Sequence, residues 1–368
     1  MRPVLLTECL TEILGGQRVA LQIAEALQEH FRVVFACPGE GSLSVAALDL
    51  GLDVRFAPAL AQGSPLAVPA GGRQLQALLN DVQPGLIYVN GLTGLPAMYW
   101  ANRRSKLPLV FHLHHLVKSP LHRAAIRWID GHNPTGKSVA CSSAVAKYSG
   151  LPSQTTRILY NGVDGNRYRY QESPDMDSRI PLGSSAAQFL VAFVGDIGGI
   201  KAHELVFEAA LLAVKHLPDL QILCLGRILP AGESIVAEAK ASAKEAGVPD
   251  LFLFPGWRND LHKIYPICDL TILGHDEGFS LSGLESAACG TPLALPASGG
   301  ADELGALLEI GPRYAPMDSN SLAQQMIAAT INPGECDRKR LAQAVSEKFS
   351  TCTFRSNILD LVDNLILR

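Results

Sequence analysis

The sequence predicts an α/β protein of two doubly wound domains, each a parallel sheet with helices on both faces. The first observation is length, because 368 residues suffice for two domains of ordinary size. The second is that short apolar runs alternate with helical patterns along the chain, as in βαβ units. The third is a polar stretch at residues 168–185, which carries Pro174, Pro181 and Gly183 and is typical of an interdomain linker.

Before this stretch, the apolar runs predict the strands of a first parallel sheet. They are expected at residues 3–6, 32–36, 54–56, 86–90, 109–113, 138–141 and 157–159. Helical periodicity lies between them, for example at residues 18–30 and 73–82. The alternation predicts a first domain over residues 1–175.

After the polar stretch, a second alternating series predicts a second domain over residues 186–345. Its strands are expected at residues 189–194, 221–225, 251–254, 270–273 and 293–295, and its helices at 202–216, 233–246, 261–267 and 281–288. Residues 353–367 are amphipathic and predict a last helix within a C-terminal segment, 346–368. In such folds ligands bind at the carboxyl ends of the strands.

Composition narrows the class of protein. Apolar residues make up 48% of the chain and charged residues 18%, which permits a sizeable core and argues against disorder. The net charge of −4 argues against a nucleic-acid binder. The chain has no apolar run of about 18 residues and no secretory leader at its start, so a cytoplasmic location is expected. The eight cysteines form no Cys-x-x-Cys pair, which favours reduced, buried thiols.

Residues 277–292, with the sequence EGFSLSGLESAACGTP, are the most informative segment. Glu277 and Glu285 stand on either side of a turn that opens a helix. A helix start offers unpaired N–H groups that can hold a phosphate, and Glu285 can reach hydroxyls such as those of a ribose. The segment therefore suits a nucleotide-sugar. The competing interpretation makes Glu277 a helix-start acid and Glu285 a surface acid.

This segment resembles the donor-binding motif of family 4 glycosyltransferases, the large retaining class with the GT-B fold. The resemblance covers nearly the whole chain. It includes Gly15–Gly16, the Asn-Gly-Val-Asp sequence at residues 161–164, Gly195 with Lys201, and Gly299–Gly300. It implies two Rossmann-like domains that face each other across a cleft, with the C-terminal helix crossing back onto the first domain.

The resemblance also implies roles for individual residues. His114, Lys201 and Glu277 are expected to be catalytic. Glu277 would orient sugar hydroxyls, Glu285 would bind the ribose, and the N–H groups of residues 279–281 would hold the distal phosphate. The expected donor-binding residues are Gly15, Gly16, Gly195, Lys201, Arg227, Trp257, Arg258, Glu277, Gly278, Phe279, Ser280, Leu281 and Glu285.

One departure from the family pattern bears on the donor diphosphate. The family has a Gly-Arg pair followed by Lys-Gly, whereas this chain has Asp196 in place of the arginine and Ala202 in place of the second glycine. An acid would repel a diphosphate. Either Asp196 points away and Arg227 or Arg258 supplies the charge, or the donor chemistry is altered or lost.

At three places in the predicted site, alternatives stay open. His112 and His114 share one face at the end of a predicted strand, and the family has a histidine there that contacts the donor sugar or phosphate. His114 is taken as the match to that family histidine, and His112 is the second choice. The competing interpretation is a histidine whose hydrogen bonds are made only to backbone groups at the edge of the sheet. Trp257 either stacks on the base or packs on its domain. Gly15–Gly16 either approaches the ligands or forms a plain turn.

The predicted activity is transfer of a sugar from a UDP- or GDP-sugar to a hydroxyl acceptor, which is a glycan, a lipid-linked acceptor or a small molecule. The family mechanism is attack on the face of the leaving group, and no Asp-x-Asp pair stands at a strand end, so neither a metal nor any other cofactor is expected. One alternative is a catalytically silent GT-B protein that binds a nucleotide-sugar or a partner enzyme. Another is a nucleotide-sugar epimerase, which the motif set argues against.

Acceptor choice is assigned to two loops of the first domain, at residues 62–72 and 117–122. The stretch 118–127 carries several basic side chains. It is either a solvated helix face or a surface for an anionic acceptor, and the second interpretation predicts weak peripheral contact with the inner face of a membrane.

Overall fold

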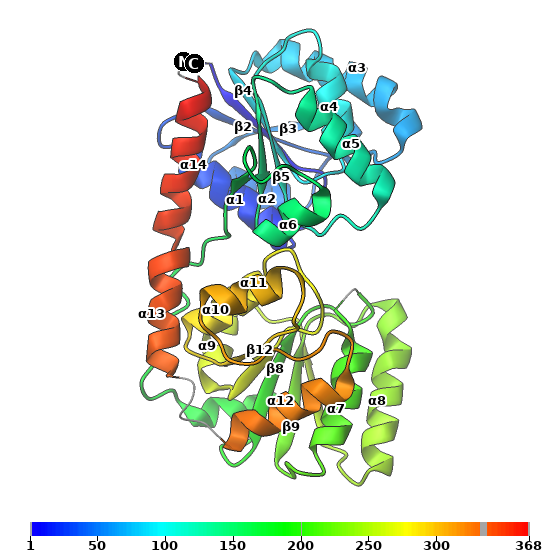
Figure 1. Cartoon of the computed structure of the whole chain (residues 1–368), viewed down its shortest axis with the longest axis vertical. Helices are drawn as coiled ribbons and strands as arrows, with labels where there is room; N and C mark the ends of the chain where they lie inside the picture. The colour runs from blue at the N-terminus through cyan, green and yellow to red at the C-terminus, as the bar shows by residue number, and fades with distance from the viewer. Residues whose placement is uncertain (1, 200, 332–336, 367–368) are drawn as a thin grey trace. The chain divides into compact units, whose positions relative to one another are not determined.

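The computed structural model describes residues 2–199, 201–331 and 337–366, and the chain divides into two compact units (Figure 1). The first unit comprises residues 1–162 and 351–368, and the second comprises 163–350. Residue 367, the predicted end of the last helix, and residue 368, the end of the predicted C-terminal segment, lie outside the described residues. So do residues 332–336 of the predicted second domain.

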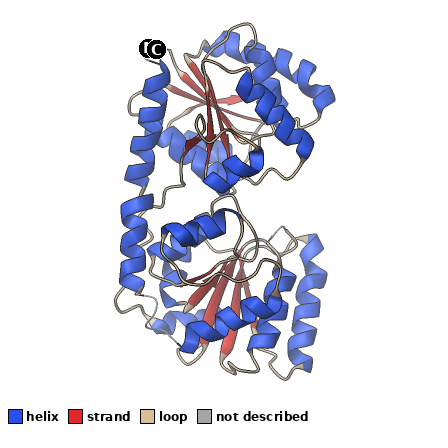
Figure 2. Cartoon of the chain, in the orientation of Figure 1, coloured by secondary structure: helices blue, strands red, loops and turns tan. Residues whose placement is uncertain are grey.

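In the described part of the first unit, seven strands form one parallel sheet in the order β3-β2-β1-β4-β5-β6-β7. Figure 2 shows the strands of each unit in red, with helices around them. The strands are β1 (Val4–Thr7), β2 (Val33–Cys37), β3 (Asp53–Phe56), β4 (Leu86–Asn90), β5 (Leu109–Leu113), β6 (Lys137–Ala140) and β7 (Arg157–Ile158). The helices are α1 (Gly15–Leu27), α2 (Ser42–Asp49), α3 (Val68–Val82), α4 (Leu95–Asn102), α5 (Pro120–Gly131), α6 (Ser143–Ser149) and α14 (Thr351–Ile366). Strands β1, β2, β4 and β5 are buried along their whole length, as expected for a parallel sheet covered on both faces.

In the described part of the second unit, five parallel strands run in the order β10-β9-β8-β11-β12. They are β8 (Phe189–Val194), β9 (Leu220–Leu225), β10 (Phe252–Gly256), β11 (Leu270–Ile272) and β12 (Leu293–Ala294). The α-helices are α7 (His203–Ala213), α8 (Glu233–Glu245), α9 (Leu261–Ile264), α10 (Leu281–Ala288), α11 (Gly299–Leu307), α12 (Ser319–Ile331) and α13 (Arg338–Phe349). Both sheets are therefore doubly wound, as predicted.

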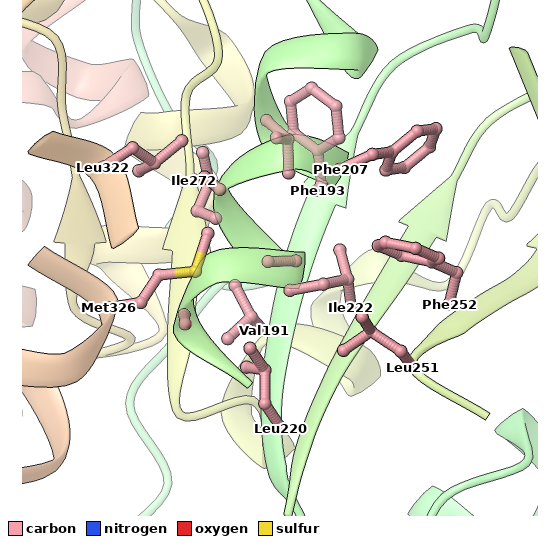
Figure 3. Packing of buried hydrophobic residues seen from close by; sticks show 14 of the residues in the cluster. Val191, Phe193, Phe207, Leu220, Ile222, Leu251, Phe252, Ile272, Leu322 and Met326 are labelled. Carbon is pink, nitrogen blue, oxygen red and sulfur yellow. The ribbon is translucent and has the colours of Figure 1, made fainter. Parts of the chain in front are cut away.

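The core of the second unit shows why a continuous apolar run is needed in each strand. Val191 and Phe193 of β8 and Ile222 of β9 pack in one cluster with residues of α7, α8 and α12 (Figure 3). The intervening residues, Leu190 and Ala192 among them, pack in a second cluster on the opposite face. Because successive side chains alternate between faces and both faces are covered, every residue of β8 is apolar.

The predicted linker is wrong. Residues 168–185 lie inside the second unit, where Met176–Leu182 forms a 3-10 helix. Arg179 of this helix is 1% exposed, donates to the carbonyl of Ile267 at 2.8 Å and pairs with Asp269 at 2.9 Å. The polar, proline-containing stretch is therefore anchored by hydrogen bonds and is not a flexible connection between domains.

The change of unit instead falls within the Asn-Gly-Val-Asp sequence. Gly162 is the last residue of the first unit in this part of the chain, and Val163 begins the second. The N–H of Val163 donates to the carbonyl of Phe349 at 2.8 Å, one residue before the chain leaves the second unit. Helix α14 then packs on α1 within the first unit.

Arg179→Met is expected to destabilise the second unit by about 3 kcal/mol or more, because the carbonyls of Ile267 and Gln188 lose this donor and Asp269 loses its cation. The measurement is the urea midpoint followed by circular dichroism. Arg104→Met, at an exposed position of the first unit, is the matched control. Equal midpoints for the two variants would contradict the structural role of Arg179.

Candidate active site

The candidate site lies where the strand order of the second sheet reverses. Strand β8 lies between β9 and β11, and the loops that follow β8 and β11 carry Lys201 and Glu277. Lys201 Nζ donates to Glu277 Oε1 at 2.5 Å, with 24% and 15% of the two side chains exposed. Two of the three predicted catalytic residues therefore meet at the point where doubly wound sheets bind ligands.

Two glycines make room for this lysine. A Cβ on Gly195 would lie 2.6 Å from Lys201 Cγ, and a Cβ on Gly274 would lie 2.5 Å from the carbonyl oxygen of Lys201. Distances this short require that no side chain is present at either position. Gly195 of the predicted site is thus needed for the placement of Lys201, and Gly274 acts in the same way from the other strand end.

Glu277 is a charged acceptor. Burial opposes its ionisation, but Lys201, followed by His275, outweighs burial and holds the pKa of Glu277 below its ordinary value of 4.5. His275 Nδ1 lies 3.8 Å from the same carboxylate oxygen. Glu277 therefore remains ionised at neutral pH and can accept hydrogen bonds from hydroxyls. The interpretation of Glu277 as a mere helix-start acid does not account for this pair.

The backbone after Glu277 is held by two helices of the same unit. The carbonyl of Glu277 accepts from the N–H of Gly300 at 2.8 Å, and a Cβ on Gly300 would lie 1.7 Å from the carbonyl oxygen of Gly278. Phe279 is buried against Phe349 of α13, with ring centroids 5.5 Å apart. Gly299 and Gly300, singled out in the sequence, are the first residues of α11 and fix the shape of this loop.

Helix α10 begins directly after this loop. Ser280 is its N-cap and accepts from the N–H of Gly283 at 3.2 Å, while Leu281 is the first helical residue. Glu285 lies in the same helix and is 1% exposed. The interpretation of Glu285 as a surface acid is therefore wrong. Its role toward a ribose stays a prediction.

Asp196, the departure from the family pattern, holds Arg227. The ladder between β8 and β9 continues past the strands, with the N–H of Ile197 donating to the carbonyl of Arg227 at 2.8 Å. Asp196 accepts from Arg227 N at 2.8 Å, Nε at 3.0 Å and Nη2 at 2.6 Å. Burial raises the pKa of Asp196, but the Arg227 hydrogen bonds outweigh burial and lower it below the ordinary value. The acid at 196 thus positions a guanidinium beside the site.

The other proposed substitute, Arg258, is also engaged. It donates to Asp260 through Nε at 2.8 Å and Nη2 at 2.6 Å. Its neighbour Trp257 is 64% exposed, so both interpretations, stacking on a base and packing on its domain, stay open. Ala202, which replaces a family glycine, has a φ of +52°, a conformation that favours glycine.

In the first unit, the predicted residues His114 and Gly16 lie together. Gly15 and Gly16 are the first residues of α1 rather than a turn before it, and a Cβ on Gly16 would lie 3.9 Å from His114 Cδ2. His114 Nε2 lies 2.7 Å from Asn90 Oδ1, so its partner is a side chain rather than the backbone. Burial, followed by the neighbouring His112 and His115, holds the pKa of His114 well below its usual range.

His112 is not a substitute for His114. Its side chain is fully buried, and its Nδ1 lies 3.0 Å from the Tyr88 hydroxyl. The rings of His112 and His114 are 4.2 Å apart, which confirms that they share one face. In the described ranges of the chain, no group of three or more His, Cys, Asp or Glu side chains is arranged to hold a metal ion.

Sequence reasoning missed Glu8 and Asn90, which are 2% exposed and hydrogen-bonded to each other. Glu8 directly follows β1, and Asn90 is the last residue of β4. Polar residues at the ends of two apolar runs were a visible signal. What was missing was the strand order, which makes β1 and β4 neighbours.

The first unit also has an apolar cavity of about 430 Å³, lined by Val68, Pro96, Tyr99, Trp100, Arg103, Ala125, Trp128 and Ile129 of α3, α4 and α5. None of its lining residues belongs to the predicted catalytic or donor-binding set. Among the helices of the described ranges, none combines the length and apolar character that crossing a membrane requires.

Comparison with known proteins identifies the family of this chain. The model for Glycosyltransferase Family 4 matches residues 13–167, and the model for Glycosyl transferases group 1 matches residues 177–347. D-inositol 3-phosphate glycosyltransferase of Thermobispora bispora is 31% identical over 158 residues, which is 40% of this chain and 36% of that protein. The enzyme of the same name from Mycobacterium sp. strain JLS is 36% identical over 148 residues, 39% of this chain and 32% of its own length. The match thus spans about a third of these relatives.

Solved structures show the fold. Anabaena Alr3699/HepE, in complex with UDP, superposes with a TM-score of 0.84 at 21% identity, covering 98% of this chain and 100% of that chain. Sucrose-phosphate synthase from Thermosynechococcus elongatus superposes with a TM-score of 0.76 at 18% identity, covering 100% of both chains. Two Rossmann-like parallel sheets with these structural neighbours define the GT-B class. Within that class, the chain belongs to glycosyltransferase family 4.

The lowered pKa of Glu277 predicts how its contribution to stability depends on pH. A carboxylate with a depressed folded pKa stabilises above its unfolded pKa, and this contribution is lost as pH falls through the folded pKa. The melting-temperature difference between wild type and Glu277→Gln is therefore expected to stay constant from about pH 8 to about pH 5 and to shrink below about pH 4.5.

The measurement is differential scanning calorimetry across this range. Glu245→Gln, at an exposed position of α8, is the control and is expected to change the melting temperature little at any pH. If the Glu277→Gln difference vanishes between about pH 7 and pH 5, Glu277 is not held ionised by Lys201.

Proposed function

We propose that this chain transfers a hexosyl group from a UDP- or GDP-sugar to a hydroxyl acceptor, with retention of the anomeric configuration. The observation that carries the proposal is the Lys201–Glu277 pair at the strand reversal of the second sheet, next to α10. Family membership supports the reaction class. The relatives named as D-inositol 3-phosphate glycosyltransferases support a hydroxyl-bearing small molecule, and inositol 3-phosphate is the first acceptor to test.

The proposed roles follow from the chemistry of each side chain. Lys201 offsets the charge that develops on the departing diphosphate, and Glu277 accepts hydrogen bonds from sugar hydroxyls. The backbone N–H groups of residues 279–281 hold the distal phosphate, and Glu285 binds the ribose. Trp257 is exposed enough to stack on the base. The UDP complexes of Alr3699/HepE make UDP the first nucleotide to test.

In the proposed reaction the acceptor hydroxyl attacks the anomeric carbon on the face that the diphosphate leaves. A phosphate oxygen of the leaving group takes the hydroxyl proton, so the protein supplies positioning and charge stabilisation rather than a covalent nucleophile. Neither a metal nor another cofactor takes part in this scheme.

One observation favours the alternative of a catalytically silent protein. Each cation of the candidate site is matched by a carboxylate, in the pairs Lys201–Glu277, Arg227–Asp196 and Arg258–Asp260. A diphosphate would therefore meet charges that are already compensated. A protein of this kind would bind a nucleotide-sugar, or only a partner enzyme, without transfer.

The test is binding of UDP, GDP, UDP-glucose and GDP-mannose by calorimetry and thermal shift. One donor is expected to bind, and Lys201→Ala and Glu285→Gln are each expected to weaken it about 10- to 100-fold, the loss of a charge-assisted hydrogen bond. Lys215→Ala, at an exposed position in the same unit, is the matched control. Transfer to inositol 3-phosphate is then followed by NMR, where the anomeric coupling of the product reports retention.

Three results would count against the proposal. Binding of a donor with neither transfer nor hydrolysis would support the silent nucleotide-sugar binder. No binding at all would support the partner-binding form. An inverted anomeric configuration in the product would contradict the retaining mechanism but not the transfer of a sugar.

The arrangement of Asp196 and Arg227 makes a second prediction for the donor. Arg227→Gln is expected to weaken UDP binding about 10-fold, because the guanidinium that Asp196 holds beside the site is lost. Asp196→Asn removes a negative charge but keeps only one of the two oxygens that accept from Arg227, so it is expected to bind UDP more weakly than wild type and more tightly than Arg227→Gln. Weaker binding by Asp196→Asn than by Arg227→Gln would show that Asp196 itself contacts the donor.

A further inference from the structure

A chain of polar groups, in which Glu8 and Asn90 are buried and His114 is half-buried, lies at the strand reversal of the first sheet. Strand β1 lies between β2 and β4, and β5 follows β4, so the carboxyl ends of β1, β4 and β5 are adjacent. Glu8, Asn90 and His114 stand at or just past these ends. Their side chains are linked to one another and to the backbone of α1 through Gly16.

The amide of Asn90 has one possible orientation in this network. Its Nδ2 donates to Glu8 Oε2 at 2.6 Å and to the carbonyl of Gly16 at 3.0 Å. A backbone carbonyl can only accept, so the NH₂ side of the amide must face Gly16 whatever the protonation of Glu8. The oxygen of Asn90 therefore faces His114, and its distance to Nε2 is 2.7 Å.

This orientation determines the tautomer of His114. An amide oxygen can only accept, so Nε2 of His114 must carry a proton. A neutral imidazole has a single N–H, and burial with His112 at 4.2 Å keeps His114 neutral by lowering its pKa. Nδ1 is then the nitrogen with the lone pair.

We propose that Asn90 is a positioning residue, set by Glu8 and the Gly16 carbonyl, that holds His114 as the Nε2–H tautomer so that Nδ1 accepts a hydrogen bond from a sugar hydroxyl. An ionised diphosphate has no hydrogen to donate, so a bare Nδ1 recognises a hydroxyl and not a phosphate oxygen. The inference rests on the proposed function for its substrate class. The tautomer itself is a property of the chain alone.

The test is the imidazole spectrum of ¹⁵N-histidine-labelled protein, in which two-bond ¹H–¹⁵N correlations distinguish the two tautomers. His114→Gln assigns the signals by their disappearance. Wild type is expected to show Nε2 protonated and Nδ1 bare, and Asn90→Ala to show a mixture of tautomers. If the chain transfers sugar, Asn90→Ala is expected to lower kcat about 10- to 100-fold, while the Kd for UDP changes less than about 3-fold.

Asn102→Ala is the matched control. Asn102 is a buried asparagine of the same unit, bonded through both amide ends to the backbone of Leu107. The Asn102→Ala variant is expected to lose about as much stability as Asn90→Ala and to leave the His114 tautomer unchanged. Glu8→Gln retains an oxygen that accepts from Asn90 and is expected to preserve the Nε2–H tautomer.

Two results would overturn the inference. One is a wild-type His114 that carries its proton on Nδ1. The other is an unchanged tautomer in Asn90→Ala, because another group would then be setting it. Both readouts need no substrate, so they remain decisive even if the proposed transfer reaction is not found.

Discussion

The strand order of the two parallel sheets is the constraint on which the rest of this structure depends. Both faces of each sheet are covered, so the central strands carry mainly apolar side chains. Polar groups that could meet a ligand gather at the strand ends. Where the order reverses, next to β1 and next to β8, the connections diverge and expose the carboxyl ends of neighbouring strands. The groups argued here to carry the chemistry, Lys201 with Glu277 and His114 with Asn90, lie at these two positions.

Burying polar groups costs free energy, and this cost is offset in a different way at each of the two positions. At the second sheet the solution is ion pairing, since each cation is held by a carboxylate that also fixes its direction. Such pairs contribute little net stability once the loss of hydration is counted, but they place charge accurately. At the first sheet the solution is hydrogen bonding through the Asn90 amide, which sets the direction of His114, while burial keeps the imidazole neutral by lowering its pKa. Charge suits a diphosphate, and a neutral acceptor suits a hydroxyl.

Much of the fold could be predicted because parallel strands are read directly from apolar runs. The predicted ranges 86–90, 109–113 and 189–194 coincide with β4, β5 and β8. The linker at 168–185 could not be identified correctly, because proline and polar residues look alike in a flexible connection and in a segment anchored by a buried Arg179. Lys201 and Glu277 could be found from local sequence. Glu8 and Asn90 could not, since 82 residues separate them and only the strand order makes them neighbours.

Asp196 departs from the family pattern, but a positively charged group is still placed beside the candidate site. An acid there would be unfavourable for a diphosphate if it stood alone. The ladder between β8 and β9 continues past both strands and brings Arg227 beside it, where two side-chain nitrogens and one backbone N–H donate to the carboxylate. The positive group thus comes from the end of β9 rather than from the end of β8. Its charge is partly offset by Asp196, so in the proposed donor site Lys201 and the start of α10 would supply a larger share of the attraction for a phosphate than they would beside an unpaired arginine.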